Sequence, residues 1–140
     1  MASAISKVAL CNLGFRPFFL GAAIFAIVSM TFWMGVYVLQ LPLPITRIST
    51  FQWHAHEMIY GFAMAVIAGF LLTAIKNWTG VQTLYGFGLL GLFALWALPR
   101  ILFLFGTPLI FVAGFFDLLF GLCLIGSTMY PIVKAKQWKQ

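Results

Sequence analysis

The stretch Gly61-Phe62-Ala63-Met64-Ala65-Val66-Ile67-Ala68-Gly69-Phe70-Leu71-Leu72-Thr73-Ala74-Ile75 decides the fold of this chain. It carries no charge, and a small residue recurs at every fourth position: Gly61, Ala65, Gly69 and Thr73. This spacing puts the four side chains on one face of a helix, where a second helix backbone can approach closely. We call these four residues the small-residue stripe. An uncharged helix that carries such a stripe is typical of a membrane protein.

The composition of the whole chain agrees with a membrane environment. Of its 140 residues, 64% are hydrophobic and 7% are charged, and the mean hydropathy is +1.08, which soluble domains do not show. A helix needs roughly 20 residues to cross a hydrocarbon core of about 30 Å. Four apolar runs are long enough, at 17–39, 51–75, 83–105 and 108–132. We therefore predict an all-α polytopic membrane protein, in which residues 1–140 form a single domain of four transmembrane helices with short loops.

The basic residues indicate how the chain is oriented. Those that flank the first, second and fourth spans on one side are Lys7, Arg16, Lys76, Lys134, Lys136 and Lys139. By the positive-inside rule that side is cytoplasmic. We expect a protein of the bacterial inner membrane with both termini in the cytoplasm. The net charge of +6 is dispersed over these positions, so the expected partner is the lipid bilayer and not nucleic acid.

The motif Trp53-His54-Ala55-His56-Glu57-Met58 lies at the expected outer end of the second span. It holds both histidines and one of the two acids of the chain. Imidazole and carboxylate at a membrane boundary need a partner, which makes a metal, haem or proton site the functional hypothesis. Copper(I) suits imidazole with a thioether such as Met58, and haem iron suits imidazole alone. The alternative is that the two histidines are exposed to water at the membrane surface and cap the helix.

The local backbone decides whether the two histidines can act together. In an extended segment, His54 and His56 share a side and could chelate one ion. On a helix they project about 200° apart and cannot do so, and His56 then stacks on Tyr60. A ligating histidine also needs an acceptor for its second nitrogen, which Glu57 or Asp117 could supply. The sequence does not decide whether this segment is extended or helical.

The second acid, Asp117, lies inside the fourth span. At mid-membrane it costs roughly 2.5–3.5 kcal/mol on insertion scales, so it needs a partner. Arg100 and Arg16 are the candidates, and a structural ion pair and a proton-relay acid are both open roles. Gly114 and Gly121 share its side of the helix, so we expect Asp117 to face a close-packed, glycine-lined contact.

Several motifs, in this order along the chain, resemble the NnrS family. They are Gly14-Phe15-Arg16-Pro17-Phe18-Phe19, Trp53-His54-Ala55-His56-Glu57-Met58-Ile59-Tyr60-Gly61-Phe62, Val66-Ile67-Ala68-Gly69-Phe70-Leu71-Leu72-Thr73-Ala74, Asn77-Trp78-Thr79-Gly80, Arg100 and Asp117-Leu118-Leu119-Phe120. That family comprises polytopic haem- and copper-containing membrane proteins linked to the nitric oxide response. The resemblance implies that His54, His56 and Glu57 belong to a metal or haem site region. Family members are usually much longer, so this chain resembles their N-terminal part.

Two functions follow from these expectations. In the first, the chain binds haem or copper through His54 and His56 in nitrogen-oxide or respiratory metabolism. In the second, it is a non-catalytic accessory subunit of a larger membrane enzyme complex. Either way we expect other membrane subunits or a second copy, because one chain offers few metal ligands, and we do not expect an independent enzyme. A proton conductor using Glu57 and Asp117 is a weaker hypothesis, because no further polar path joins the two acids.

Overall fold

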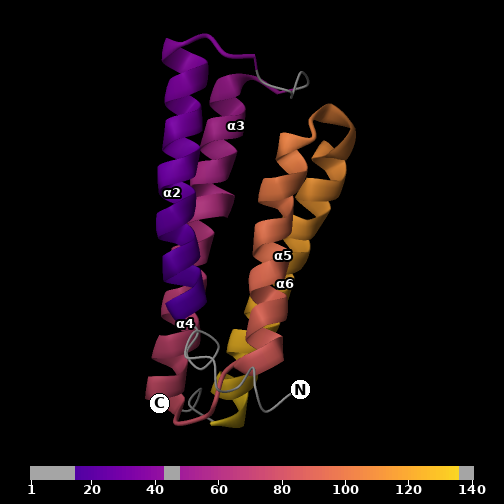
Figure 1. Ribbon diagram of the computed structural model, residues 1–140. Helices are drawn as coiled ribbons and strands as arrows, with labels where there is room; N and C mark the ends of the chain where they lie inside the picture. Colours follow the sequence, from indigo (N-terminus) through magenta and orange to yellow (C-terminus); the bar gives the residue numbers. More distant parts are fainter. Residues whose placement is uncertain (1–14, 43–47, 136–140) are drawn as a thin grey trace.

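The computed structural model describes residues 15–42 and 48–135, which form a bundle of four long helices (Figure 1). The first is α2 (Phe15–Val38), and the second runs without a break through α3 (Thr50–His56), the π-helix η2 (Glu57–Ala63) and α4 (Met64–Thr79). α5 (Gly86–Leu104), the short 3₁₀-helix η3 (Thr107–Leu109) and α6 (Ile110–Lys134) complete the described chain. Four helices are long and apolar enough to cross a membrane. The predicted all-α fold with four spans is therefore confirmed.

Polar residues and glycine set the ends of the second helix. The hydroxyl of Ser49 accepts a hydrogen bond from the Gln52 N–H at 3.1 Å, and the Gln52 side chain accepts one from the Ser49 N–H at 2.9 Å. This capping box satisfies amides that have no partner within the helix. At the other end Gly80 takes the left-handed conformation, with φ 68°, which glycine adopts without strain. The helix therefore continues to Thr79, beyond the expected end at residue 75.

The chain runs up and down the bundle, so alternate helix ends lie together. Figure 1 shows the start of α2, the end of α4 and the end of α6 at one end of the molecule. Arg16, Lys76 and Lys134 occupy these three helix ends. The other basic residues that indicate the orientation lie outside the described residues: Lys7, Lys136 and Lys139.

The four helices form two hairpins, because α2 packs along α4 and α5 packs along α6, while α4 also contacts α6. The small-residue stripe lies in the contact between α2 and the second helix. Ala65 is fully buried there, and a Cβ added to Gly69 would lie 3.0 Å from the Phe19 ring. A Cβ on Gly61 would likewise lie 2.7 Å from Cζ of Phe25. The stripe therefore allows the close helix approach that its spacing predicts.

The expectation that glycines line the contact around Asp117 was wrong. Asp117 is buried, but the Cβ positions of Gly114 and Gly121 have no atom within 4 Å. The side of α6 that packs in the bundle carries larger residues: Ala113, Asp117, Phe120, Leu124, Thr128 and Pro131. Three residues along a helix correspond to a rotation of about 60° away from the starting side. That rotation is enough to turn Gly114 out of the contact that buries Asp117.

The π-helix η2 was not predicted from the sequence. The N–H of Met64 bonds to the carbonyl of Ile59, five residues earlier, instead of four. A π-turn of this kind inserts one residue into a helix and turns the residues on either side relative to one another. Glu57 and Gly61 are its buried residues. The turn thus lies where the polar motif meets the apolar part of the helix.

Candidate functional site

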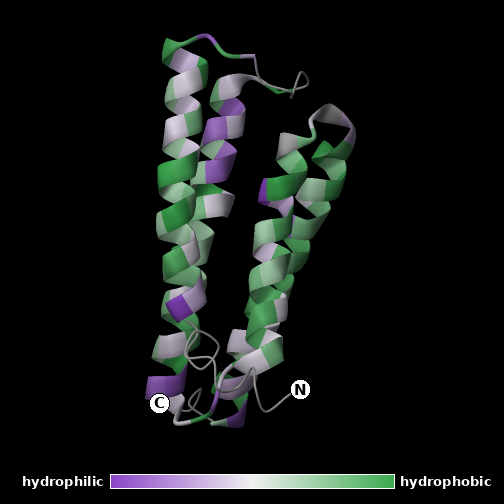
Figure 2. Cartoon of the chain, in the orientation of Figure 1, coloured by the Kyte–Doolittle hydropathy of each residue, from purple (hydrophilic) through white to green (hydrophobic). Residues whose placement is uncertain are grey.

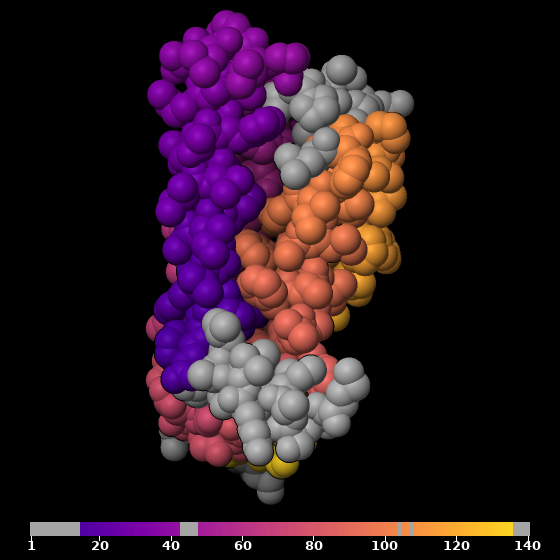
Figure 3. All heavy atoms as spheres, viewed as in Figure 1, coloured from indigo at the N-terminus to yellow at the C-terminus, as the bar shows by residue number. Residues whose placement is uncertain are grey.

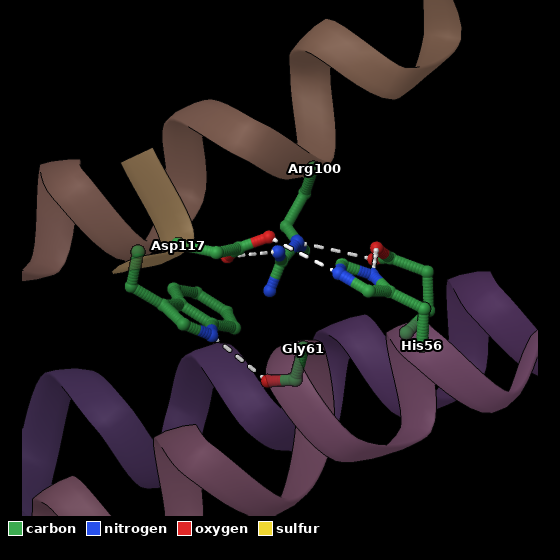
Figure 4. A network of polar contacts seen from close by, with 6 residues as sticks. His56, Gly61, Arg100 and Asp117 are labelled. Carbon is green, nitrogen blue, oxygen red and sulfur yellow. Dashed lines mark hydrogen bonds and ion pairs between the residues drawn. The ribbon is translucent and has the colours of Figure 1, made fainter. Parts of the chain in front are cut away.

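Four side chains from both hairpins meet in the part of the bundle that holds the π-helix (Figure 4). They are His56 at the end of α3, Glu57 at the start of η2, Arg100 of α5 and Asp117 of α6. We call these four residues the charged cluster. It contains both acids of the chain. Figure 2 shows hydrophilic positions on α3 and α5 facing one another, and further hydrophilic positions at the helix ends on the opposite side of the molecule.

Arg100 lies between the two carboxylates. Its Nη2 donates a hydrogen bond to Oδ1 of Asp117, and its Nε is 3.1 Å from Oε2 of Glu57. The second contact is an ion pair without the alignment of a hydrogen bond, since Nε has no hydrogen-bond partner among the described residues. Glu57, Arg100 and Asp117 are 1%, 9% and 4% exposed. Burial of these charges is tolerable because each has an opposite charge in contact.

The arginine that pairs with Asp117 is therefore Arg100. The other candidate, Arg16, lies in the first turn of α2, with its guanidinium 5.9 Å from the centre of the Phe15 ring. Arg100 and Asp117 come from adjacent helices of one hairpin, close to the turn that joins them. Their pairing thus requires only that the two helices of this hairpin pack together.

His56 completes the cluster from the second helix. Its Nδ1 is 3.1 Å from Oε1 of Glu57, and its Nε2 is 3.5 Å from Oδ2 of Asp117. The ring also stacks on Tyr60, with 4.7 Å between the ring centres, as expected for a helical motif. The contact with Asp117 lacks the alignment of a hydrogen bond, since Oδ2 of Asp117 has no hydrogen-bond partner among the described residues. His56 thus contacts both acids of the cluster.

His54 lies on another side of the helix and outside the charged cluster. Its ring stacks on Trp33 of α2, with 4.2 Å between the ring centres. Its Nδ1 is buried and has no hydrogen-bond partner among the described residues. Because α3 is helical here, the geometry in which both histidines chelate one ion does not occur. Met58 follows Glu57 in η2 and is half-buried.

The charged cluster does not fit a metal or haem site. In residues 15–42 and 48–135, no group of three or more His, Cys, Asp or Glu side chains is placed to hold a metal ion. Both nitrogens of His56 face carboxylate oxygens, and both carboxylates contact Arg100. A metal on His56 would have to displace one of these contacts. His54 fits the role of a single ligand better, since its buried nitrogen has no partner to lose.

Trp96 ties the cluster region of α5 to the π-helix. Its indole N–H donates a hydrogen bond of 2.8 Å to the carbonyl oxygen of Gly61 (Figure 4). Trp96 is one helical turn before Arg100, so this bond fixes the position of Arg100 along the helix axis relative to Glu57. No pattern in the sequence indicates the bond, because it depends on a backbone oxygen. The charged members, by contrast, stand out as rare polar residues in apolar spans.

Comparison with known proteins identifies a family but no individual relative. The family model described as NnrS protein matches residues 9–140 of the chain. The matched range contains the whole charged cluster, together with His54 and Trp96. No curated protein and no solved structure matches the chain.

Proposed function

The chain belongs to the NnrS family, and we propose that it binds haem or copper through His54 in nitrogen-oxide or respiratory metabolism. The remaining ligands then come from a second copy of the chain or from another membrane subunit. The observation that carries the proposal is the unequal engagement of the two histidines. His56 faces two carboxylates, whereas Nδ1 of His54 has no hydrogen-bond partner among the described residues.

The residues of this chain have separate tasks in the proposal. The stacking of His54 on Trp33 holds the imidazole in one orientation, which lowers the entropic cost of ligation. Bound haem or copper would supply the electron transfer or the coordination of a small ligand. The charged cluster holds α3 and η2 against α5 and α6, so His56 positions the segment that carries His54. The motif would face the outer side of a bacterial inner membrane, because Arg16, Lys76 and Lys134 share the opposite end of the bundle.

Metal analysis and optical spectra of the protein, purified in its native assembly in mild detergent, test the proposal. We expect stoichiometric haem or copper in the wild type and its loss in His54→Ala. The matched variant His56→Gln should keep the metal but unfold at a lower temperature, because it weakens the charged cluster. Retention of the metal by His54→Ala, or its loss in His56→Gln alone, would contradict the assignment to His54.

A second candidate function, as a non-catalytic accessory subunit, has support from α6. Gly114 and Gly121 lie on an open face of this helix together with Leu118, which is 63% exposed. Small residues on a lipid-facing helix allow close contact with another helix. In this reading Gly114→Leu should reduce the mass of the native complex without lowering the unfolding temperature. A wild-type protein that is monomeric in mild detergent would exclude this function.

A further inference from the structure

A cavity of about 190 Å³ lies next to the charged cluster, between α2, the start of the second helix and α5. Its polar lining consists of Ser29, Glu57 and Arg100. The rest of the lining is apolar and largely aromatic: Phe25, Val28, Phe32, Trp53, Ile101 and Phe103. A cavity of about 10–15 Å³ holds one water, and pockets for drug-sized ligands start at about 300 Å³. The cavity therefore suits a group of about one ring.

Two polar atoms of the residues that line this cavity have neither a hydrogen-bond partner nor an ion-pair partner among the described residues. They are Oγ of Ser29, in a residue 3% exposed, and Nη1 of Arg100, in a residue 9% exposed. Figure 4 shows one terminal nitrogen of Arg100 that no dashed line reaches, directed away from Asp117. Buried polar atoms almost always have a partner, so two of them at one cavity indicate a missing ligand or water. Both atoms can donate a hydrogen bond.

A second, apolar cavity of about 270 Å³ adjoins this one along α2 and α5. The two share four lining residues: Phe25, Val28, Arg100 and Ile101. The second cavity is also lined by Ile24, which is 54% exposed, and by Phe93. It therefore lies between the polar cavity and the lipid-facing surface. Figure 3 shows this face of the molecule, where α2 and α5 border a furrow.

We propose that the two cavities bind a quinone with an alkyl tail. The ring lies in the inner cavity, where one carbonyl oxygen accepts a hydrogen bond from Arg100 and the other accepts one from Ser29. The tail follows the apolar cavity between α2 and α5 into the lipid. An aromatic lining suits a flat ring, which can stack on it.

The charges around the cavity exclude the main alternatives. A phosphate or carboxylate headgroup would approach Glu57, which lines the same cavity, and the two negative charges would repel each other. A hydrocarbon chain would leave both donors without partners. A neutral group that only accepts hydrogen bonds satisfies both donors and adds no charge. This inference does not depend on a metal at His54.

Quenching of tryptophan fluorescence by decylubiquinone tests the proposal, since Trp53 lines the inner cavity and Trp96 the outer one. The protein is placed in nanodiscs of phosphatidylcholine that contain no quinone. We expect saturable quenching in the wild type. Ser29→Ala, which loses one neutral hydrogen bond, should raise the Kd about three- to tenfold. Ser29→Leu, which fills the inner cavity, should abolish saturation.

Thr31→Ala is the matched control, because it removes a hydroxyl from the same helix outside both cavities. It should bind like the wild type. Decylbenzene, which has a ring and tail but no carbonyl, should not compete. Non-saturable quenching, equal in the wild type and in Ser29→Ala, would overturn the proposal and leave water in the cavity. Competition by decylbenzene at the same concentration would also overturn it. If Ser29→Leu fails to fold, Ser29→Ala and the competitor still decide the question.

Discussion

Replacing Arg100 by methionine tests whether the charged cluster holds the two hairpins together. The substitution keeps a long side chain but removes the guanidinium that contacts both Glu57 and Asp117. These carboxylates are 1% and 4% exposed, so water screens them little. Removal of one partner from a buried ion pair costs about 3–5 kcal/mol. We expect the free energy of unfolding to fall by about this amount for Arg100→Met, because two buried carboxylates lose the cation that lies between them.

Unfolding by SDS in mixed micelles, followed by tryptophan fluorescence, measures this change. Lys134→Met is the matched control, since it removes an exposed cation near the end of α6 and should cost less than about 1 kcal/mol. Adding Glu57→Gln and Asp117→Asn to Arg100→Met removes the two buried carboxylates that have lost their guanidinium, so the triple variant should recover most of the stability. A triple variant no more stable than Arg100→Met would refute the reasoning, as would a loss in Arg100→Met no larger than in the control.

Three further predictions are tested by the same SDS unfolding measurement. Gly61→Ala should lower the free energy of unfolding by about 1–3 kcal/mol, because the added Cβ would meet the Phe25 ring. Gly114→Ala lies in open space and should raise it by about 0.5–1 kcal/mol. Equal effects of the two substitutions would contradict this prediction. Trp96→Phe should cost about 1–3 kcal/mol, because the Gly61 carbonyl loses its donor, and an unchanged free energy of unfolding would rule out that role. Asp117→Leu should cost more than Asp117→Asn, which keeps an oxygen for the guanidinium of Arg100; the reverse order would assign the effect to charge alone.

The four helices could be predicted from the sequence because each is a long apolar run that is stable in lipid on its own. The pairing of Asp117 was predicted with two candidates, Arg100 and Arg16, and the structure shows that the partner is Arg100. The contact between His56 and Asp117 was anticipated only in part, because Asp117 was one of two acceptors considered for a histidine and the sequence did not decide which histidine would reach it. It depends on the rotation of the second helix, which the π-turn at Glu57 changes by one residue, and no residue pattern marks such a turn. The same dependence on rotation explains why Gly114 was placed on the wrong side.

The two hairpins of this bundle are held by different kinds of contact. Between α2 and the second helix, the small-residue stripe gives close packing, which stabilises helix pairs in lipid where the hydrophobic effect does not. Between the hairpins, the charged cluster and the bond from Trp96 to Gly61 add directional contacts at the π-helix. Directional contacts fix the rotation of each helix about its axis and its position along that axis, both of which apolar packing leaves variable. His56 therefore takes part in the contacts that hold the hairpins together, and His54, which lies outside them, is the histidine that we propose as the ligand.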